Sequence, residues 1–346
     1  MTIKQIAEKA NVSIATVDRV IHKRGRVAKK TRDIILSIIK QSGYKKNIFA
    51  SNLKLQKTFN VAVLMPEIMQ ESKYWETSKN GIIKALMELT IYKLKADFFY
   101  FDRFSSESFD MASKNIYGKH YDGIIMAPVN EKKSLELLKR IPNNTPYVFF
   151  NTDLPGAMPV CFIGQDSFGS GVVAARLMKE IINERGEIAI IQASEDEFHH
   201  ASRANGFLSF FERSDLFDIK IYRLHGNTEK EPFISLMDDI VTENKSLKGI
   251  FVTSASCHYA AEYLNNSSVK NKIRIIGYDL VEENIKYLNE GGIDILISQK
   301  PEDQGYRAVY SLFRKLVLHE NPDRKIMMPV DIIIRENLNQ YLASDR

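Results

Sequence analysis

The polar residues best able to bind a small molecule stand directly after short apolar runs of the sequence. They are Asn151, Asp153, Asp166, Ser254, Ser256, Asp279 and Gln299. Arg203 lies at the start of a helix-like stretch, Ser202–Phe207. Each sugar hydroxyl both donates and accepts hydrogen bonds, so carboxylates, amides, hydroxyls and a guanidinium together suit a polyhydroxylated ligand.

Two adjacent aromatic residues add a possible stacking surface to this set. Tyr74 and Trp75, the latter the only tryptophan, are expected in the loop after the first apolar run, where either ring can stack on a sugar face. For each of these polar and aromatic residues, an ordinary structural role as a strand-end cap or surface group is the alternative.

The elements that would position these residues are eleven short apolar runs, most of them separated by helix-length segments. The runs span residues 60–65, 94–101, 122–127, 147–150, 160–164, 187–193, 218–224, 249–253, 273–277, 294–298 and 330–334. This alternation predicts parallel sheets covered by helices on both faces. Eleven strands exceed one comfortable sheet, so we expect two α/β subdomains, with ligands bound where the carboxyl ends of strands converge.

The N-terminal residues differ sharply in charge from the rest of the chain. Residues 1–57 contain 14 Lys and Arg against three acidic residues, a net charge of +11, so the remaining residues carry −6 of the overall +5. A basic head joined to an acidic body indicates a nucleic-acid-binding domain, although docking on protein or RNA remains an alternative.

The head is predicted to contain three short helices. Thr2 and Ser13 stand at N-cap positions, and Ile6, Val17 and Val20 lie on apolar faces of the first two helices. A third helix is expected from about Ala28 to Ser42, with Ile34, Ile35, Ile38 and Ile39 facing inward and Gly43 ending it. Two short helices across a tight turn are typical of a helix-turn-helix.

The sequence of the head is specific in detail. Residues 2–21 read TIKQIAEKANVSIATVDRVI, followed by Gly25-Arg26-Val27, Thr31-Arg32 and Gly43-Tyr44. This pattern resembles the head of the lactose-repressor (LacI/GalR-type) family of transcriptional regulators. The resemblance implies a helix-turn-helix domain at residues 1–45 that reads DNA bases with the exposed face of its second helix.

By this resemblance and the helix caps, ten residues are candidates for DNA contact. They are Thr2, Ser13, Ile14, Ala15, Thr16, Arg19, His22, Lys23, Leu53 and Lys54. Arg19 is the expected guanine reader, because a guanidinium can bond O6 and N7 together. Asp18 stands where the family usually has Ser, and its carboxylate can accept from a cytosine amine, pair with Arg19 or Lys23, or weaken binding.

Residues 46–58 are helix-capable but have too small an apolar face to fold alone. They resemble the hinge helix of the family, which orders when two copies pair on DNA. The resemblance implies that Leu53 wedges into a minor-groove step while Lys54 stays on the backbone. An ordinary surface linker is the alternative.

The resemblance continues through the body, residues 59–346, and implies a periplasmic-binding-protein-like core for effector binding and dimerisation. One subdomain would span about 59–162 plus 299–327, and the other about 163–298 plus 328–346. The family positions for effector contact fall on Trp75, Asn151, Arg203, Asp279 and Gln299. The chain departs from sugar-binding relatives at Ser256-Cys257, where Asn-Asp is frequent, and at Asn151, where Asp is common.

Other motifs are weaker. The G-x-G-x-x-A match at residues 169–174 lies four residues beyond its expected strand, which disfavours a dinucleotide site. His199-His200 lacks further ligands at metal-site spacing and is expected at a solvated helix start. Cys161 and Cys257 are predicted to be buried thiols. We therefore expect no cofactor, no metal and no catalytic residues.

Taken together, these features predict a cytoplasmic, nucleoid-associated repressor: a homodimer that binds a pseudopalindromic operator under allosteric control by a sugar or sugar derivative. No segment approaches the ~18 apolar residues of a membrane span, and no signal peptide is evident. An α/β enzyme with a basic targeting head is the main alternative, and a solute-binding transport protein is a third.

Overall fold

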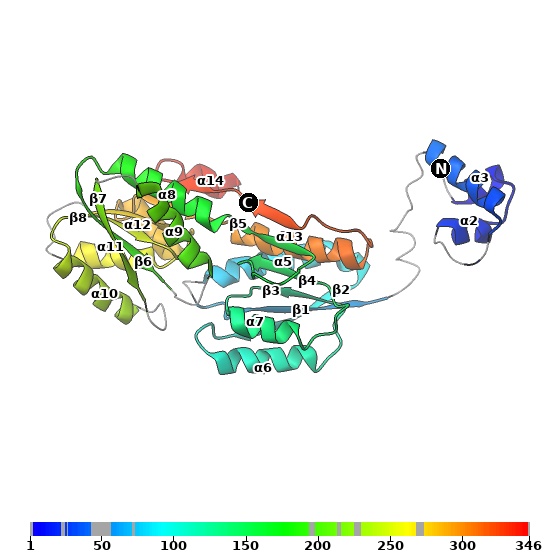
Figure 1. Cartoon of the computed structure of the whole chain (residues 1–346), viewed down its shortest axis with the longest axis horizontal. Helices are drawn as coiled ribbons and strands as arrows, with labels where there is room; N and C mark the ends of the chain where they lie inside the picture. Colours follow the sequence, from blue (N-terminus) through cyan, green and yellow to red (C-terminus); the bar gives the residue numbers. More distant parts are fainter. Residues whose placement is uncertain are drawn as a thin grey trace. The chain divides into compact units, whose positions relative to one another are not determined.

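The computed structural model describes residues 3–21, 25, 27–42, 57–70, 73–193, 198–212, 216–224, 230–267 and 273–344. The chain forms two compact units, Met1–Gln56 and Lys57–Arg346, each with its own core (Figure 1). Among the described residues, no helix combines the length and apolar character needed to cross a membrane.

The described part of the head consists of three helices, α1 (Ile3–Lys9), α2 (Ile14–Ile21) and α3 (Lys29–Ser42). Ile6, Val17 and Ile35 are fully buried and form its small core, which confirms the predicted apolar stripes. Ile34 was expected to face inward but is 43% exposed, because Ile35 occupies the core-facing position of α3. The predicted end of α3 at Gly43 lies outside the described residues.

The second unit contains two six-stranded sheets. The first has the order β11-β5-β4-β3-β1-β2, and the second β12-β10-β9-β8-β6-β7. The strands of the first are β1 (Phe59–Pro66), β2 (Leu94–Phe101), β3 (Gly123–Met126), β4 (Tyr147–Asn151), β5 (Cys161–Gln165) and β11 (Lys325–Met328). Those of the second are β6 (Gly186–Gln192), β7 (Phe217–Arg223), β8 (Leu247–Val252), β9 (Arg274–Tyr278), β10 (Ile295–Ser298) and β12 (Asp331–Ile333). All eleven predicted strands are confirmed, and only β11 was missed.

Every strand pair in the two sheets is parallel except β10 with β12. The four-residue β11 lies at an edge of the first sheet with only Met328 buried, so its apolar signal in the sequence is weak.

Helices cover both faces of each sheet, as the βαβ alternation predicts. In the first lobe, α5 (Tyr74–Glu88) and α13 (Pro301–Leu316) lie on one side, and α6 (Ser106–Tyr117) and α7 (Glu131–Leu138) on the other (Figure 1). A short 3-10 helix, η1 (Thr90–Tyr92), precedes β2.

In the second lobe, the two faces of the sheet have separate apolar clusters. One cluster contains residues of α8 (Ser167–Ile181) and α9 (Phe198–Phe211). The other contains residues of α10 (Lys230–Glu243), α11 (Cys257–Asn266), α12 (Glu282–Glu290) and α14 (Leu338–Ser344). Ile190 faces the first cluster and Ile191 the second, as the two-residue period of a strand requires.

The chain passes between the lobes three times, after β5, after β10 and between β11 and β12. Because β5 pairs in the first sheet through Gln165, the first crossing follows Gln165 rather than residue 162. The buried Gln165 amide nitrogen donates to the carbonyl oxygens of Ser298 at 3.0 Å and Pro329 at 2.7 Å. One side chain thus bonds the first crossing to the other two.

Two glycines allow the helices α5 and α13 to pack backbone against backbone. A Cβ at Gly81 would lie 1.9 Å from the carbonyl oxygen of Glu302, and one at Gly305 would lie 2.2 Å from that of Ser78. No rotamer change relieves a clash with backbone, so neither position accommodates a larger residue without separating the helices.

We expect Gly81→Ala to destabilise the second unit by about 1–3 kcal/mol, because the new methyl group must displace α13. The sign is informative, since the same change in an exposed helix stabilises by about 1 kcal/mol. Urea unfolding of the purified protein measures the effect. Asn80→Ala, at an exposed neighbouring position of α5, is the control and should cause no loss. A stabilised Gly81→Ala variant would contradict the close packing.

Candidate functional site

The exposed face of α2 carries the predicted base-reading side chains. The Ser13 hydroxyl oxygen accepts from the Thr16 backbone nitrogen at 3.2 Å, which caps the helix as predicted. Val17 and Val20 are buried against the head core, so Ile14, 52% exposed, and Arg19 lie on the opposite, accessible side. Of the ten candidate DNA contacts, Thr2, His22, Lys23, Leu53 and Lys54 lie outside the described residues.

In the second lobe, the structure brings three predicted effector residues into one buried hydrogen-bonded chain. Gln299 Nε2 donates to Asp279 Oδ2 at 2.7 Å, and the Gln299 backbone nitrogen is 3.3 Å from Asp279 Oδ1. Arg203 Nη2 donates to Gln299 Oε1, and Nη1 donates to the Thr253 carbonyl oxygen at 2.6 Å. All three side chains are at most 3% exposed.

The backbone at these strand ends is held in an unusual conformation. Asn151, Asp279 and Lys300 have φ of 69°, 65° and 53°, the left-handed region that non-glycine residues rarely adopt. The amide nitrogen of Asn284 lies 2.9 and 3.0 Å from the carbonyl oxygens of Tyr278 and Asp279, which fixes the turn after β9. Such strain is typical of functional sites.

A second chain of hydrogen bonds links the first lobe to Gln299. Asn151 Nδ2 donates to the Tyr74 hydroxyl oxygen at 2.8 Å, and the Asn151 backbone nitrogen donates to Gln304 Oε1 at 2.8 Å. Gln304 Nε2 in turn donates to the Gln299 carbonyl oxygen at 2.8 Å. Residues from β4, α5 and α13 are therefore connected to Asp279 and Arg203 of the other lobe.

Several buried polar atoms at the strand ends have no hydrogen-bond partner among the described residues. They include Asn151 Oδ1, Thr152 Oγ1 and Arg203 Nε. Because buried polar groups are normally bonded, a cluster of such atoms at the facing ends of two sheets is expected where a polar ligand binds.

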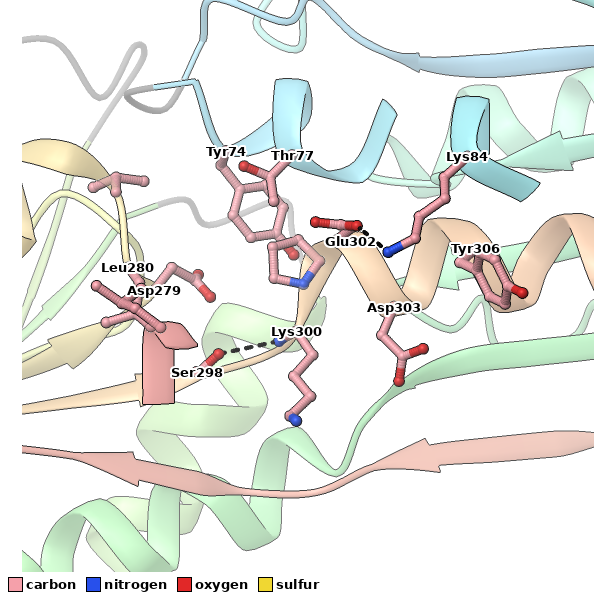
Figure 2. A pocket seen from close by; sticks show the side chains of 13 residues that line it. Tyr74, Thr77, Lys84, Asp279, Leu280, Ser298, Lys300, Glu302, Asp303 and Tyr306 are labelled. Carbon is pink, nitrogen blue, oxygen red and sulfur yellow. Dashed lines mark hydrogen bonds and ion pairs between the residues drawn. The ribbon is translucent and has the colours of Figure 1, made fainter. Parts of the chain in front are cut away.

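A cavity of about 520 Å³ adjoins this network (Figure 2). Its walls come from α5 and the start of α13 on one side and from the loop after β9 on the other. Its lining comprises Tyr74, Thr77, Lys84, Asp279, Leu280, Val281, Ser298, Lys300, Pro301, Glu302, Asp303, Tyr306 and Leu342. Of the predicted effector residues, Tyr74 and Asp279 line it. A volume of this size accommodates a small organic ligand.

Other predicted effector residues are placed differently from the sequence expectation. Trp75 lies in the first turn of α5 rather than in a loop, is 1% exposed and packs edge-on against Tyr74 and Phe150. Asp153 pairs with Lys325 at 2.9 Å and lines a separate hollow. The buried Ser256 precedes α11 and lies outside the lining of this cavity.

Arg203 and Asp166 also differ from their expected settings. Arg203 is the sixth residue of α9 rather than its start, since the helix begins at Phe198. The exposed Asp166 caps α8, because its Oδ1 accepts from the Gly169 backbone nitrogen at 3.0 Å.

The sequence analysis missed a group of basic residues around Arg203. His199 and His200 were expected to be solvated but are 6% and 1% exposed, with ring centroids 4.1 Å apart. Arg103, from the loop after β2 in the other lobe, is 7% exposed. Burial lowers the pKa of both histidines well below the usual 6.5, and the charges of Arg203 and Arg103 lower it further.

The glycine motif at residues 169–174 has a packing role in this structure. It lies within α8, where a Cβ on Gly171 would sit 2.1 Å from the Arg203 carbonyl oxygen, so the glycine permits close contact with α9. Among the described residues, no group of three His, Cys, Asp or Glu side chains is arranged to hold a metal ion. Cys161 and Cys257 are buried free thiols, as predicted.

The sequence matches two family models. Residues 61–320 match a periplasmic binding protein domain, and residues 2–47 match bacterial regulatory proteins of the lacI family. Catabolite control protein A of Priestia megaterium is 26% identical over 81% of this chain and 82% of that protein. The HTH-type transcriptional repressor PurR of Histophilus somni strain 2336 is 24% identical over 97% of this chain and 98% of that protein.

A solved structure shows the same similarity in three dimensions. It is that of a Bacteroides fragilis protein assigned to the LacI transcriptional regulators. It has a TM-score of 0.76 and 27% identity, and covers 82% of this chain and 100% of that chain.

We expect the two buried histidines to make the folded protein sensitive to mild acid. Their pKa is lowered in the folded state, so the unfolded chain takes up protons first as the pH falls below about 6.5. The free energy of unfolding should then decrease by up to about 1.4 kcal/mol per pH unit for each histidine.

Urea unfolding between pH 7.5 and 5.5 measures this slope. His200→Gln should flatten it, whereas His120→Gln, at an exposed position, should leave it unchanged. Equal slopes for His200→Gln and the unmodified chain would contradict the assignment.

Proposed function

The chain belongs to the lacI family of bacterial regulatory proteins and is a DNA-binding transcriptional regulator; from this we propose that it represses transcription under the control of a sugar or sugar derivative. The observation that carries the effector part is the bonded network of Asp279, Gln299 and Arg203, placed beside a cavity and among buried polar atoms with no described partner. Hydroxyl groups of a ligand can supply both the donors and the acceptors that these atoms require.

On DNA, the proposed reader is the exposed face of α2. Arg19 would bond a guanine in the major groove, Ile14 and Ala15 would contact neighbouring base edges, and Thr16 would hold a phosphate. We propose a homodimer on a pseudopalindromic operator, because two heads related by a two-fold axis read two half-sites. Within the hinge segment 46–58, Leu53 would be the minor-groove wedge and Lys54 a backbone contact.

In the body, the proposed effector contacts come from both lobes. Tyr74 and Asn151 would bind from the first lobe, and Asp279, Gln299 and Arg203 from the second. A ligand that bonds to both lobes favours their closed arrangement, and any difference in its affinity between the arrangements shifts their populations. A few kcal/mol of such difference suffices to change operator affinity.

The relatives reported above are transcriptional regulators, and we propose that this chain likewise releases its effector chemically unchanged. We also propose that it acts in the cytoplasm, where its DNA target is found. The competing enzyme function predicts turnover of a bound compound, and the ligand screen described below would detect it.

We expect full-length protein to select a pseudopalindromic duplex from a random pool, with affinity that falls steeply as salt rises, reflecting several phosphate contacts. Arg19→Ala should weaken this specific binding by about 1–3 kcal/mol and relax preference at one base pair of each half-site. Lys40→Ala, which removes an exposed charge from α3, is the control and should keep the sequence preference. Fluorescence anisotropy at several salt concentrations measures both. Binding without sequence preference would contradict the proposal.

We expect one member of a panel of sugars, sugar acids, polyols and nucleosides to raise the melting temperature of the protein. At 100 times its dissociation constant, a ligand adds about 2.7 kcal/mol of stability. Asp279→Asn preserves the size and the left-handed backbone of the residue while removing a charged acceptor, so this stabilisation should be largely lost.

Asp153→Asn is the matched control for the effector site, because Asp153 faces Lys325 outside the cavity and should respond as the unmodified chain does. If the two variants respond alike, Asp279 does not contact the effector.

A further inference from the structure

Starting from the proposed effector function, we infer that the effector carries an anionic group, a carboxylate or a phosphate, which binds between Arg203 of the second lobe and Arg103 of the first. Its hydroxyl groups would then face Asp279 and Asn151. The ligand class is therefore a hydroxylated acid, such as a sugar acid or a sugar phosphate, rather than a neutral sugar.

The first observation concerns the contacts of Arg203. Its guanidinium is 1% exposed, and its described hydrogen bonds end on two neutral oxygens, the Thr253 carbonyl and Gln299 Oε1. Its charged carbon lies 3.8 Å from the centroid of the buried Tyr278 ring. The third donor, Nε, has no partner among the described residues. A buried charge held only by neutral groups is costly, and a ligand anion would offset that cost.

The lysines that line the cavity provide a contrast. Lys84 lies 3.1 Å from the Glu302 carboxylate, and Lys300 lies 3.3 Å from that of Asp331. Figure 2 shows the first of these pairs across the cavity wall. These cations already have carboxylate partners from the protein, whereas the described hydrogen bonds of Asp279 run to Gln299. An added anion is therefore best matched to Arg203.

The second observation is that cationic and imidazole groups from both lobes converge near Arg203. Arg103 comes from the first lobe, and its charge lowers the pKa of His199 and His200 in the second. Bringing two guanidiniums toward the same buried region opposes closure of the lobes unless negative charge accompanies it. Glu195, Asp196 and Glu197 precede these histidines in the sequence and lie outside the described residues. An anion on the ligand would supply charge at the guanidiniums themselves.

The geometry of the donors fits an oxyanion. A guanidinium presents parallel N–H groups that match the two oxygens of a carboxylate or two oxygens of a phosphate, and such charge-assisted bonds are about twice as strong as neutral ones. Two arginines on opposite lobes would let the same anionic group contribute to closure. Ligand charge would then be a direct determinant of the regulatory response.

Calorimetric titration of the full-length protein with matched neutral and anionic probes tests this inference. The probes are D-glucose, D-glucuronate and D-glucose 6-phosphate, together with D-galactose and D-galacturonate. We expect an anionic member to bind at least about tenfold more tightly than its neutral counterpart. The carboxylate and phosphate arms identify which anion the site accepts.

Variants assign the discrimination to the residues named. Arg103→Gln should reduce affinity for the anionic probe at least about tenfold while leaving a neutral probe unchanged, and Arg103→Lys should restore part of it. Lys84→Gln is the charge-matched control, because Lys84 is already paired with Glu302, and it should change neither affinity. Arg103→Gln also avoids the risk that a substitution at the fully buried Arg203 prevents folding.

A neutral sugar that binds as tightly as its acid, or an Arg103→Gln variant that affects both probes equally, would overturn the anionic assignment. The proposed sugar-controlled regulator would survive either outcome if that neutral sugar altered operator affinity. Absence of binding for every probe would contradict both the anionic ligand and the sugar effector, whereas sequence-specific operator binding would still support the regulatory function of the head.

Discussion

The amide of Gln299 is the interaction on which the rest of the site depends. Its side chain bonds to both Asp279 and Arg203, and its carbonyl accepts from Gln304, which holds Asn151. Gln299 follows directly on β10 at the second crossing between the lobes. Any relative movement of the two sheets therefore changes the geometry of these bonds, so ligand contacts and lobe position are physically coupled at a single residue.

Sequence periodicity predicted the strands and head helices well, because apolar alternation directly reflects burial on both faces of a sheet. Strand-end polarity also located Asp279 and Gln299. Burial of Trp75 was not predictable in the same way, since it depends on Phe150 from a distant strand. The position of Arg103 carries no local signal either, because its neighbours in the site belong to the other lobe.

The crossings limit how the lobes can move. Gln165 donates from the first crossing to the carbonyl oxygens of the second and third, so the three segments act as one hinge rather than three independent linkers. The Tyr341 hydroxyl, from the C-terminal helix, lies 3.0 Å from Ser298 Oγ and 2.9 Å from Asp331 Oδ2 on the same segments. A hinge constrained in this way favours two discrete lobe arrangements over continuous flexing, which suits a regulatory switch.

The left-handed backbone at Asn151 and Asp279 restricts how this binding site can diverge. Only Gly, Asn and Asp adopt that conformation at low cost, so β-branched and bulky residues are excluded at both positions regardless of the ligand. Exchange between Asn and Asp alters charge and donor capacity while leaving side-chain size nearly constant. New effector specificities at these two positions therefore arise through polarity at fixed shape, and ligand size must be tuned by other residues.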